Sequence, residues 1–241
     1  MRCILEICSM KKIKIGAPLI LGLALSINSI SAQAGPIDLN DWGFNVDGAV
    51  SLCSAPGVNC AAEPMPLTGS LNSSGLGTLN MTIAGAGSHS FTSFFDFEMV
   101  EPQNTFYNEY GFTSGTAAAG QSWEIDEPGY VFGNIFDHLW DGNLDNTNSV
   151  PAGLEEDVSF GMDWDFNLLA DETAVIELIL SDTLDTNEFY LAHVDSDSDT
   201  TIYFWSSMTI RDSTQNIPEP GTLFLLSAGL IGFAGLRRRN Q

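Results

Sequence analysis

Residues 158–166 alternate large apolar side chains with small or acidic ones, the large ones being Val158, Phe160, Met162, Trp164 and Phe166. A period of two is typical of a β-strand with one buried face. Residues 91–99 repeat the pattern, with an inward row of Phe91, Ser93, Phe95, Phe97 and Met99 and an opposite row of Thr92, Asp96 and Glu98. Both segments are therefore predicted to be strands that contribute to one hydrophobic core.

Further segments extend this pattern. Residues 174–180 are almost continuously apolar, as in a central strand, and Ile202, Phe204, Met208 and Ile210 form another apolar row. Turn-forming residues separate the segments, and we find no helical periodicity between residues 35 and 216. We expect an all-β fold for residues 35–216: a single antiparallel, jelly-roll-like β-sandwich of about eight to ten strands.

The N-terminal segment has the composition of a secretory signal peptide. Lys11, Lys12 and Lys14 make a basic start, residues 15–27 are apolar, and Ala32-Gln33-Ala34 is a cleavage site of the A-x-A type. We therefore expect residues 1–34 to be removed after Ala34. Glu6 does not suit the basic region of a signal peptide, so Met10 is the expected true start.

The C-terminal segment, residues 217–241, has three parts. Pro218-Glu219-Pro220 is stiff and extended, because proline fixes φ and disfavours helix in the residue before it. Residues 221–236 are 16 residues without a charge, and Arg237, Arg238 and Arg239 follow them. As a helix this stretch would be roughly 24 Å long, slightly shorter than the ~30 Å hydrocarbon core of a bilayer. We expect a short transmembrane helix with cytoplasmic arginines, the alternatives being an ordinary anchor or a buried core helix.

This tail resembles the PEP-CTERM sorting signal of Gram-negative bacteria. In that family the membrane protease exosortase cleaves near the tripeptide, here Pro218, Glu219 and Pro220, and releases or re-anchors the protein. The resemblance implies export by the secretion machinery, transient anchoring in the inner membrane, and a final place at the cell surface or outside the cell. Residues 41–48, 121–130 and 163–168 also resemble segments that recur in PEP-CTERM proteins of no assigned activity.

The predicted sandwich is strongly acidic. Residues 35–216 hold 29 of the 31 acidic residues, all except Glu6 and Glu219, and Arg211 is their only basic residue, so their formal charge is −28. Such a surface repels nucleic acid and anionic lipid, and we expect no nucleic-acid partner. Two interpretations stay open: solubility in salt water, or the binding of divalent cations by carboxylates at this density.

Two cysteines remain once the pre-sequence, with Cys3 and Cys8, is set aside. Cys53 and Cys60 bracket a Pro-Gly turn. In an exported protein such a pair predicts a disulfide.

Calcium is the expected cofactor, if the domain has one. Asp141, Asn143 and Asp145 offer oxygen ligands at positions 1, 3 and 5 of a loop, although Ala152 stands at position 12, where calcium-binding loops of the EF-hand type have glutamate. Asp195, Asp197 and Asp199 lie at alternate positions and could converge in a turn. The alternative for both loops is a solvated acidic turn.

Catalysis finds less support in the sequence. His89, His138 and His193 are scattered, and residues 123–127 resemble the catalytic strand of laminarinase-type glycoside hydrolases only in part. Pro128 or Gly129 stands where that family's acid/base carboxylate belongs, so Glu124 and Asp126 alone cannot run its mechanism. We expect a protein that is not an enzyme.

The function expected is therefore a structural or interaction role at the cell surface or in the extracellular matrix. PEP-CTERM systems commonly accompany exopolysaccharide production, so the resemblance implies extracellular polysaccharide as a partner and a role in matrix or biofilm. The alternative is a calcium-dependent carbohydrate-binding module, and a glycoside-hydrolase-like enzyme comes after it. Among the tryptophans, Trp164 is predicted to lie in the core, Trp205 to face outward or cap an edge, and Trp140 is the candidate for ligand contact.

Overall fold

Two antiparallel sheets make up the computed structural model, which describes residues 37–54, 58–99, 107–129 and 132–212. Sheet A has the order β2-β1-β5-β8-β7, with β2 (Ala49–Cys53), β1 (Ile37–Val46), β5 (Gly87–Met99), β8 (Ser159–Leu168) and β7 (Gln121–Asp126). Sheet B has the order β3-β4-β9-β11-β10-β6, with β3 (Thr68–Leu71), β4 (Gly77–Ala84), β9 (Glu172–Ser181), β11 (Thr200–Asp212), β10 (Tyr190–Asp195) and β6 (Glu109–Ser114). The all-β sandwich is confirmed.

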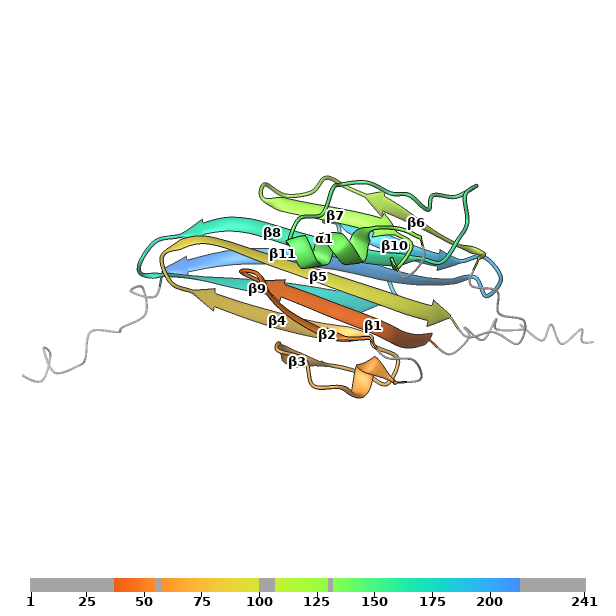
Figure 1. Ribbon diagram of the computed structural model, residues 1–241, viewed down its shortest axis with the longest axis horizontal. Helices are drawn as coiled ribbons and strands as arrows, with labels where there is room; N and C mark the ends of the chain where they lie inside the picture. The colour runs from red at the N-terminus through yellow and green to blue at the C-terminus, as the bar shows by residue number, and fades with distance from the viewer. Residues whose placement is uncertain (1–36, 55–57, 100–106, 130–131, 213–241) are drawn as a thin grey trace, which may run out of the picture. The chain divides into compact units, whose positions relative to one another are not determined.

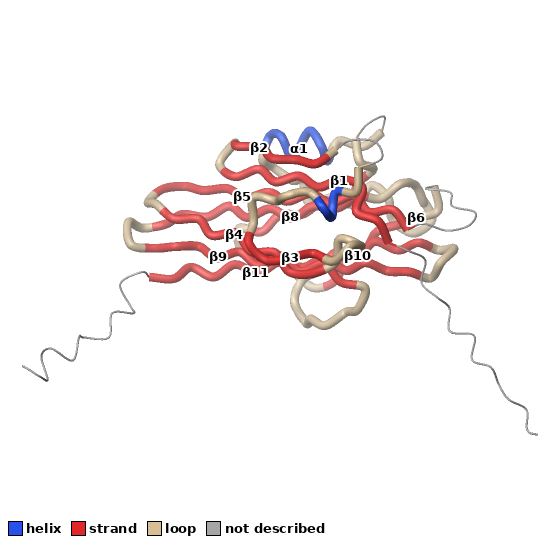
Figure 2. Tube along the Cα trace, turned by 90° about the horizontal axis from the view of Figure 1, so that it is seen from below, coloured by secondary structure: helices blue, strands red, loops and turns tan. Residues whose placement is uncertain are grey.

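The chain repeatedly crosses between the sheets. It leaves sheet A after β2, β5 and β8, and it returns from sheet B after β4 and β6. Figures 1 and 2 show the result as two stacked layers, with every neighbouring pair of strands antiparallel. Strands that are distant in sequence, such as β1 and β5, therefore lie side by side.

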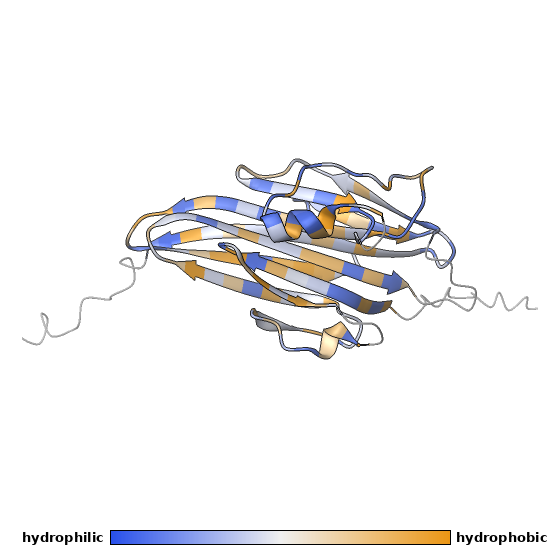
Figure 3. Ribbon diagram, in the orientation of Figure 1, coloured by the Kyte–Doolittle hydropathy of each residue, from blue (hydrophilic) through white to orange (hydrophobic). Residues whose placement is uncertain are grey.

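Strand alternation builds the core between the layers. Large residues predicted to point inward are buried there, namely Phe91, Phe95, Phe97, Met99, Val158, Phe160, Met162, Trp164 and Phe166. Figure 3 shows the same alternation as apolar and polar bands along the strands. On β11, Ile202 and Phe204 follow the prediction, whereas Ile210 is 41% exposed near the end of the strand.

A tight turn joins the first two strands. Val46 pairs with Ala49, so the connection is the dipeptide Asp47-Gly48, with φ values of 50° and 85°. Positive φ at both central residues suits the right-handed twist of a hairpin, and Asp-Gly is a preferred sequence for it.

One α-helix, α1 (Ile135–Asp141), lies on the outer face of sheet A (Figures 1 and 2). It corrects the expectation that helix is absent between residues 35 and 216. Ile135 and Leu139 pack with Phe94 and Leu144 in a small second cluster. The helix ends at Gly142, which has the left-handed conformation (φ 65°) common after a helix C-terminus.

Glycines make room for this helix. A Cβ atom on Gly43 would lie 2.3 Å from Leu139 Cδ2, and one on Gly161 would lie 3.0 Å from Leu144 Cδ1. Gly43 and Gly161 flank Phe94 in the same cross-strand row. The two glycines thus leave space on both sides of Phe94, and the second apolar cluster fills it.

The predicted disulfide is confirmed: Cys53 and Cys60 are bonded, with 5.8 Å between their Cα atoms. Both cysteines are buried, and the Trp42 indole donates a hydrogen bond of 2.9 Å to the Cys60 carbonyl. The bond therefore ties the end of β2 to the core around β1.

The helices in the described part of the chain are too short or too polar to cross a membrane. The predicted signal peptide and the predicted C-terminal apolar helix lie outside the described residues.

Candidate functional site

The outer face of sheet A carries a group of buried carboxylates. Cross-strand register places their side chains opposite the core on β1, β5, β7 and β8, and each residue is at most 7% exposed: Asp41, Asp96, Glu124, Asp126 and Asp163. Alternation alone predicts such residues to face water. Here α1 and its flanking loops cover part of the face, so these carboxylates are buried although they lie opposite the core.

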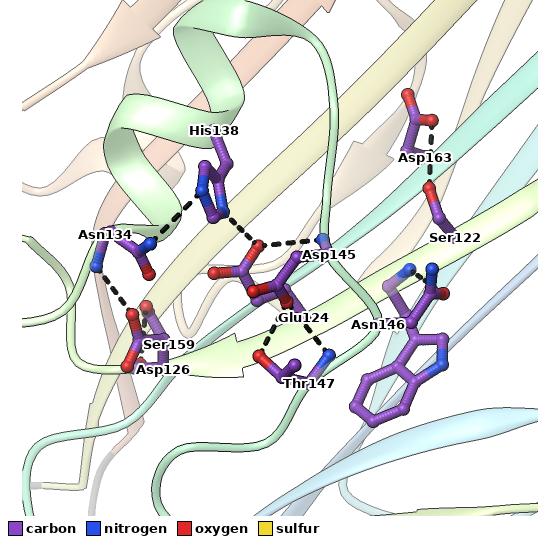
Figure 4. Close-up of polar contacts among 11 residues, drawn as sticks. Ser122, Glu124, Asp126, Asn134, His138, Asp145, Asn146, Thr147, Ser159 and Asp163 are labelled. Atoms are coloured by element: carbon purple, nitrogen blue, oxygen red, sulfur yellow. Dashed lines mark hydrogen bonds and ion pairs between the residues drawn. The ribbon is translucent and has the colours of Figure 1, made fainter.

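Glu124 and His138 form the centre of this group (Figure 4). Glu124 projects from β7 toward α1, and its Oε2 lies 2.7 Å from His138 Nδ1. The Glu124 side chain is 0% exposed and that of His138 is 23% exposed. The pair therefore fastens the helix to the sheet and remains partly accessible from the helix side.

The loop after α1 brings a third ligand-type side chain to the pair. Glu124, His138 and Asp145 each offer one atom, and these atoms lie within 4.8 Å of one another. Asp145 is exposed, its amide donates to Glu124 Oε2 at 3.4 Å, and its Oδ1 accepts bonds from the Thr147 amide and hydroxyl. An imidazole and two carboxylates from three different segments thus meet at one point.

A second layer of contacts fixes His138. The side-chain Nδ2 of Asn134 lies 3.1 Å from His138 Nε2, and the backbone N–H of Asn134 donates to Asp126 Oδ2 at 2.6 Å. Burial raises the pKa of Glu124, and the hydrogen bond from His138 offsets only part of that rise. Burial lowers the pKa of His138, but the hydrogen bond and the charge of Glu124 outweigh it, so the net shift is upward.

Asp163 lies one row further along the same face. It accepts hydrogen bonds from Thr92 Oγ1 at 2.7 Å and from Ser122 Oγ at 3.1 Å. Burial raises its pKa. These hydrogen bonds and the one from the Trp164 backbone lower it and offset the rise only in part, so the pKa is about 6. Asn45, in the same row, donates from Nδ2 to the carbonyls of Leu139 and Trp140.

Another buried ionisable pair lies between the sheets. His193 Nε2 is 2.7 Å from Glu109 Oε2, and neither side chain is more than 1% exposed. Asp157 lies near this pair, and its pKa rises to about 7 because of burial and the negative charges of Glu109 and Glu98. Burial and the charge of Asp157 also raise the pKa of Asp96 well above its usual range.

The residues predicted to bind calcium are only partly brought together. Asp145 joins Glu124 and His138, whereas Asp141 is the exposed last residue of α1 and Asn143 is exposed in the following loop. These two are not members of the group found within the described residues. Calcium binding by this loop stays a prediction.

The second predicted calcium loop is a turn that its own first residue organises. Asp195 is buried, and its Oδ1 accepts hydrogen bonds from the backbone amides of Asp197 and Ser198. Asp197 and Asp199 are exposed residues of this turn, and Asp199 has a positive φ of 53°. Calcium binding here is likewise untested by the geometry.

Aromatic side chains gather on the outer face of sheet B. Phe112 and Tyr203 lie on either side of Ala192 in one cross-strand row, and Tyr190 stands in the next row, opposite Trp205. The Tyr190 ring lies 6.2 Å from that of Phe112 and 5.7 Å from that of Tyr203, edge-to-face in both cases. We use the name aromatic row for Phe112, Tyr190 and Tyr203 together, which span these two neighbouring cross-strand rows.

The aromatic row was not predicted from the sequence, because only tryptophans were considered as candidates for ligand contact. Trp164 is buried in the core, as predicted, and Trp140 is exposed. Trp205 is on the outer face, as predicted, yet only 7% exposed. Tyr203 alternates with Ile202 and Phe204, and this alternation was the available signal for an aromatic outer face.

The residues that carry the tail and the cleavage site lie outside the described residues: Ala32, Ala34, Pro218, Glu219, Pro220, Arg237, Arg238 and Arg239. No curated protein and no solved structure matches the chain. The family model of the PEP-CTERM protein-sorting motif matches residues 216–239. The chain therefore carries a PEP-CTERM sorting motif, which marks it as an exosortase-processed protein exported to the cell surface or the extracellular space.

Proposed function

We propose that this exported protein is a non-catalytic interaction protein of the cell surface or matrix, and that the outer face of sheet B binds neutral polysaccharide. The observation that carries the proposal is the aromatic row on three adjacent strands, β6, β10 and β11. A role in exopolysaccharide or biofilm follows from this binding and from export.

The aromatic row suits an extended sugar chain. Phe112 is 37% exposed, and Tyr190 and Tyr203 are partly exposed, so ring surface remains available on an open sheet face. Tyrosine offers an apolar ring for contact with the C–H side of a sugar and a hydroxyl group for hydrogen bonding. Because the row crosses the strands, it can contact more than one sugar unit of a linear polymer.

Charge selects among polysaccharides. Residues 35–216 contain 29 acidic residues and one basic residue, Arg211. An anionic polysaccharide would be repelled by this field, whereas a neutral one is indifferent to it. We therefore favour a neutral glucan or a similar polymer as ligand.

The carboxylates of the laminarinase-like segment support a non-catalytic role. Glu124 is 0% exposed beneath α1 and bonded to His138, and Asp126 is 3% exposed and bonded to the Asn134 amide. A glycosidase needs two carboxylates that flank a bound glycosidic bond. Here both carboxylates instead bind the helix and the residue that precedes it.

The test is affinity electrophoresis of the exported protein in gels containing neutral or anionic polysaccharide. Replacing Phe112 and Tyr203 together by Ala is expected to weaken binding about tenfold, since two aromatic contacts of ~0.7 kcal/mol each amount to one decade. The matched control is Trp140→Ala, which removes an exposed aromatic residue from the other sheet's outer side and is expected to bind as wild type. Equal retardation of all three proteins would refute the proposed face.

Two further arms separate the alternatives. Calcium-dependent carbohydrate binding stays a second candidate because of the acidic loops, and it predicts that EDTA abolishes retardation. Release of reducing sugar from a retarding polymer would favour an enzyme. Retardation that persists in EDTA, with no sugar release, is the result expected here.

A further inference from the structure

We propose that Glu124, His138 and Asp145 form a binding site for one borderline first-row divalent cation, with Zn²⁺ as the best match. The site lies where α1 and its following loop meet β7 (Figure 4). It shares Asp145 with the first predicted calcium loop and takes its other two ligands, Glu124 and His138, from outside that loop. It does not depend on polysaccharide binding.

The donor set identifies the class of metal. Imidazole nitrogen suits zinc and its neighbours, whereas calcium and magnesium prefer oxygen ligands only. One histidine and two carboxylates can supply three of the four positions of a tetrahedral zinc site, and water can take the fourth. His138 therefore argues against calcium at this point.

The geometry is close to that of a bound state. The three ligand atoms lie within 4.8 Å of one another, and bonds of about 2.0–2.2 Å in a tetrahedral site place ligand atoms about 3.3–3.6 Å apart. The Glu124–His138 distance of 2.7 Å would widen slightly, and Asp145 would move inward. Asp145 is exposed in a loop, so its side chain can move without leaving a place in the core.

A buried atom without a partner points to a ligand. Glu124 Oε1 is buried, and within the described part of the chain it has no hydrogen-bond partner, although the side chain is 0% exposed. A carboxylate oxygen left unsatisfied in this way costs free energy. It belongs to the same carboxyl group whose Oε2 already contacts His138, so a cation held by both oxygens of this group would satisfy it.

Metal binding through His138 Nδ1 requires that this nitrogen give up its proton. In the neutral ring the Asn134 amide donates to Nε2, and the ring proton on Nδ1 is donated to Glu124 Oε2. Coordination through Nδ1 moves the proton to Nε2 when the ring is neutral, and releases one proton when the ring is charged. Turning the Asn134 amide over would present its oxygen to Nε2–H, the outer hydrogen bond that metal-bound histidines commonly make.

The test uses the exported protein, purified without a histidine tag and treated with a chelator. Zn²⁺ at a hundredfold excess over Kd is expected to raise the melting temperature by about 5–10 °C, and calorimetry is expected to find one ion per chain. Calcium or magnesium at the same concentration is expected to give a smaller shift.

Three variants locate the site. His138→Gln and Asp145→Asn are each expected to lose most of the zinc-induced shift, and Asp145→Asn keeps the fold because the residue is exposed. The matched control is Asp137→Asn, which removes one exposed negative charge from the same helix next to His138 and is expected to keep the shift. No shift in wild type, or an equal shift in wild type and Asp145→Asn, would overturn the proposal.

Discussion

Gly43 decides how closely α1 can approach sheet A. An alanine there would place its Cβ 2.3 Å from Leu139 Cδ2, so either the helix or the side chain must move. We expect Gly43→Ala to lower the free energy of unfolding by about 1–3 kcal/mol, as overpacking usually does. Urea unfolding measures this change.

The control for this prediction is the same substitution in a Leu139→Ala background. Removing the Leu139 side chain opens the space, so the cost of Gly43→Ala should shrink there. An unchanged cost would mean that the glycine is needed for a reason other than the helix.

Asp157 is expected to make the stability of the domain depend on pH. Its pKa in the folded protein rises to about 7, with burial as the main cause, whereas in an unfolded chain it is about 3.9. Between these values the folded state binds more protons, so stability falls as pH rises from about 4 to about 7, by at most ~1.4 kcal/mol per pH unit for one group. Asp163, whose pKa rises to about 6, acts in the same direction.

We therefore expect a higher urea midpoint at pH 5 than at pH 8, and a flatter dependence in Asp157→Asn. The groups that act on Asp157 are Glu109, Glu98 and Glu127, which raise its pKa, and His193, which lowers it. Identical pH profiles for wild type and Asp157→Asn would contradict this assignment.

At this scale the sequence predicted sides of strands well and burial poorly. It placed Asp96 opposite the inward row of Phe95 and Phe97, and that is where Asp96 lies. Its burial depends on contacts made by segments remote in sequence, which alternation within one strand does not encode. Glu124 was paired with Asp126 alone in the prediction, because His138 reaches it only once the helix is docked.

Among the elements, α1 depends on capping by a residue from β1. Asn45 donates to Leu139 O at 2.9 Å and to Trp140 O at 3.1 Å, and its Oδ1 accepts from the Gly48 amide. We expect Asn45→Ala to destabilise the domain by about 1–3 kcal/mol, because buried polar groups lose their partners. Hydrogen exchange should show faster opening of α1 than of β8.

The exposed Asn187 provides a control, since Asn187→Ala should change neither stability nor exchange in α1. If Asn45→Ala leaves exchange in α1 unchanged, the helix is held by its apolar contacts alone.

The strands could be predicted from the sequence, and the helix could not. The period of two extends over ten residues in β8, which is long enough to be distinctive. The helix has seven residues, about two turns, so Ile135 and Leu139 provide a single i, i+4 pair. The aromatic row likewise needs the pairing of β6 with β10, which brings residues 112 and 190 together across a long separation.

For the whole molecule, the excess of carboxylates predicts stabilisation by cations. With 29 acidic residues and one basic residue in residues 35–216, self-repulsion is relieved by any salt. If the loop of Asp141, Asn143 and Asp145 or that of Asp195, Asp197 and Asp199 binds calcium, calcium should raise the melting temperature by several degrees more than magnesium or sodium at equal ionic strength. Equal shifts in the three salts would reduce both loops to solvated turns.

Export with processing at both ends is the claim on which the location and the proposed partner depend, and the intact mass of the protein from its native host tests it most directly. The mass should lack residues 1–34 and the segment beyond Pro218-Glu219-Pro220, and it should show the Cys53–Cys60 disulfide as two missing hydrogens. A Glu219→Ala variant should keep its tail and remain with the membrane. A wild-type protein that retains residues 221–241 in a host with exosortase would contradict the account.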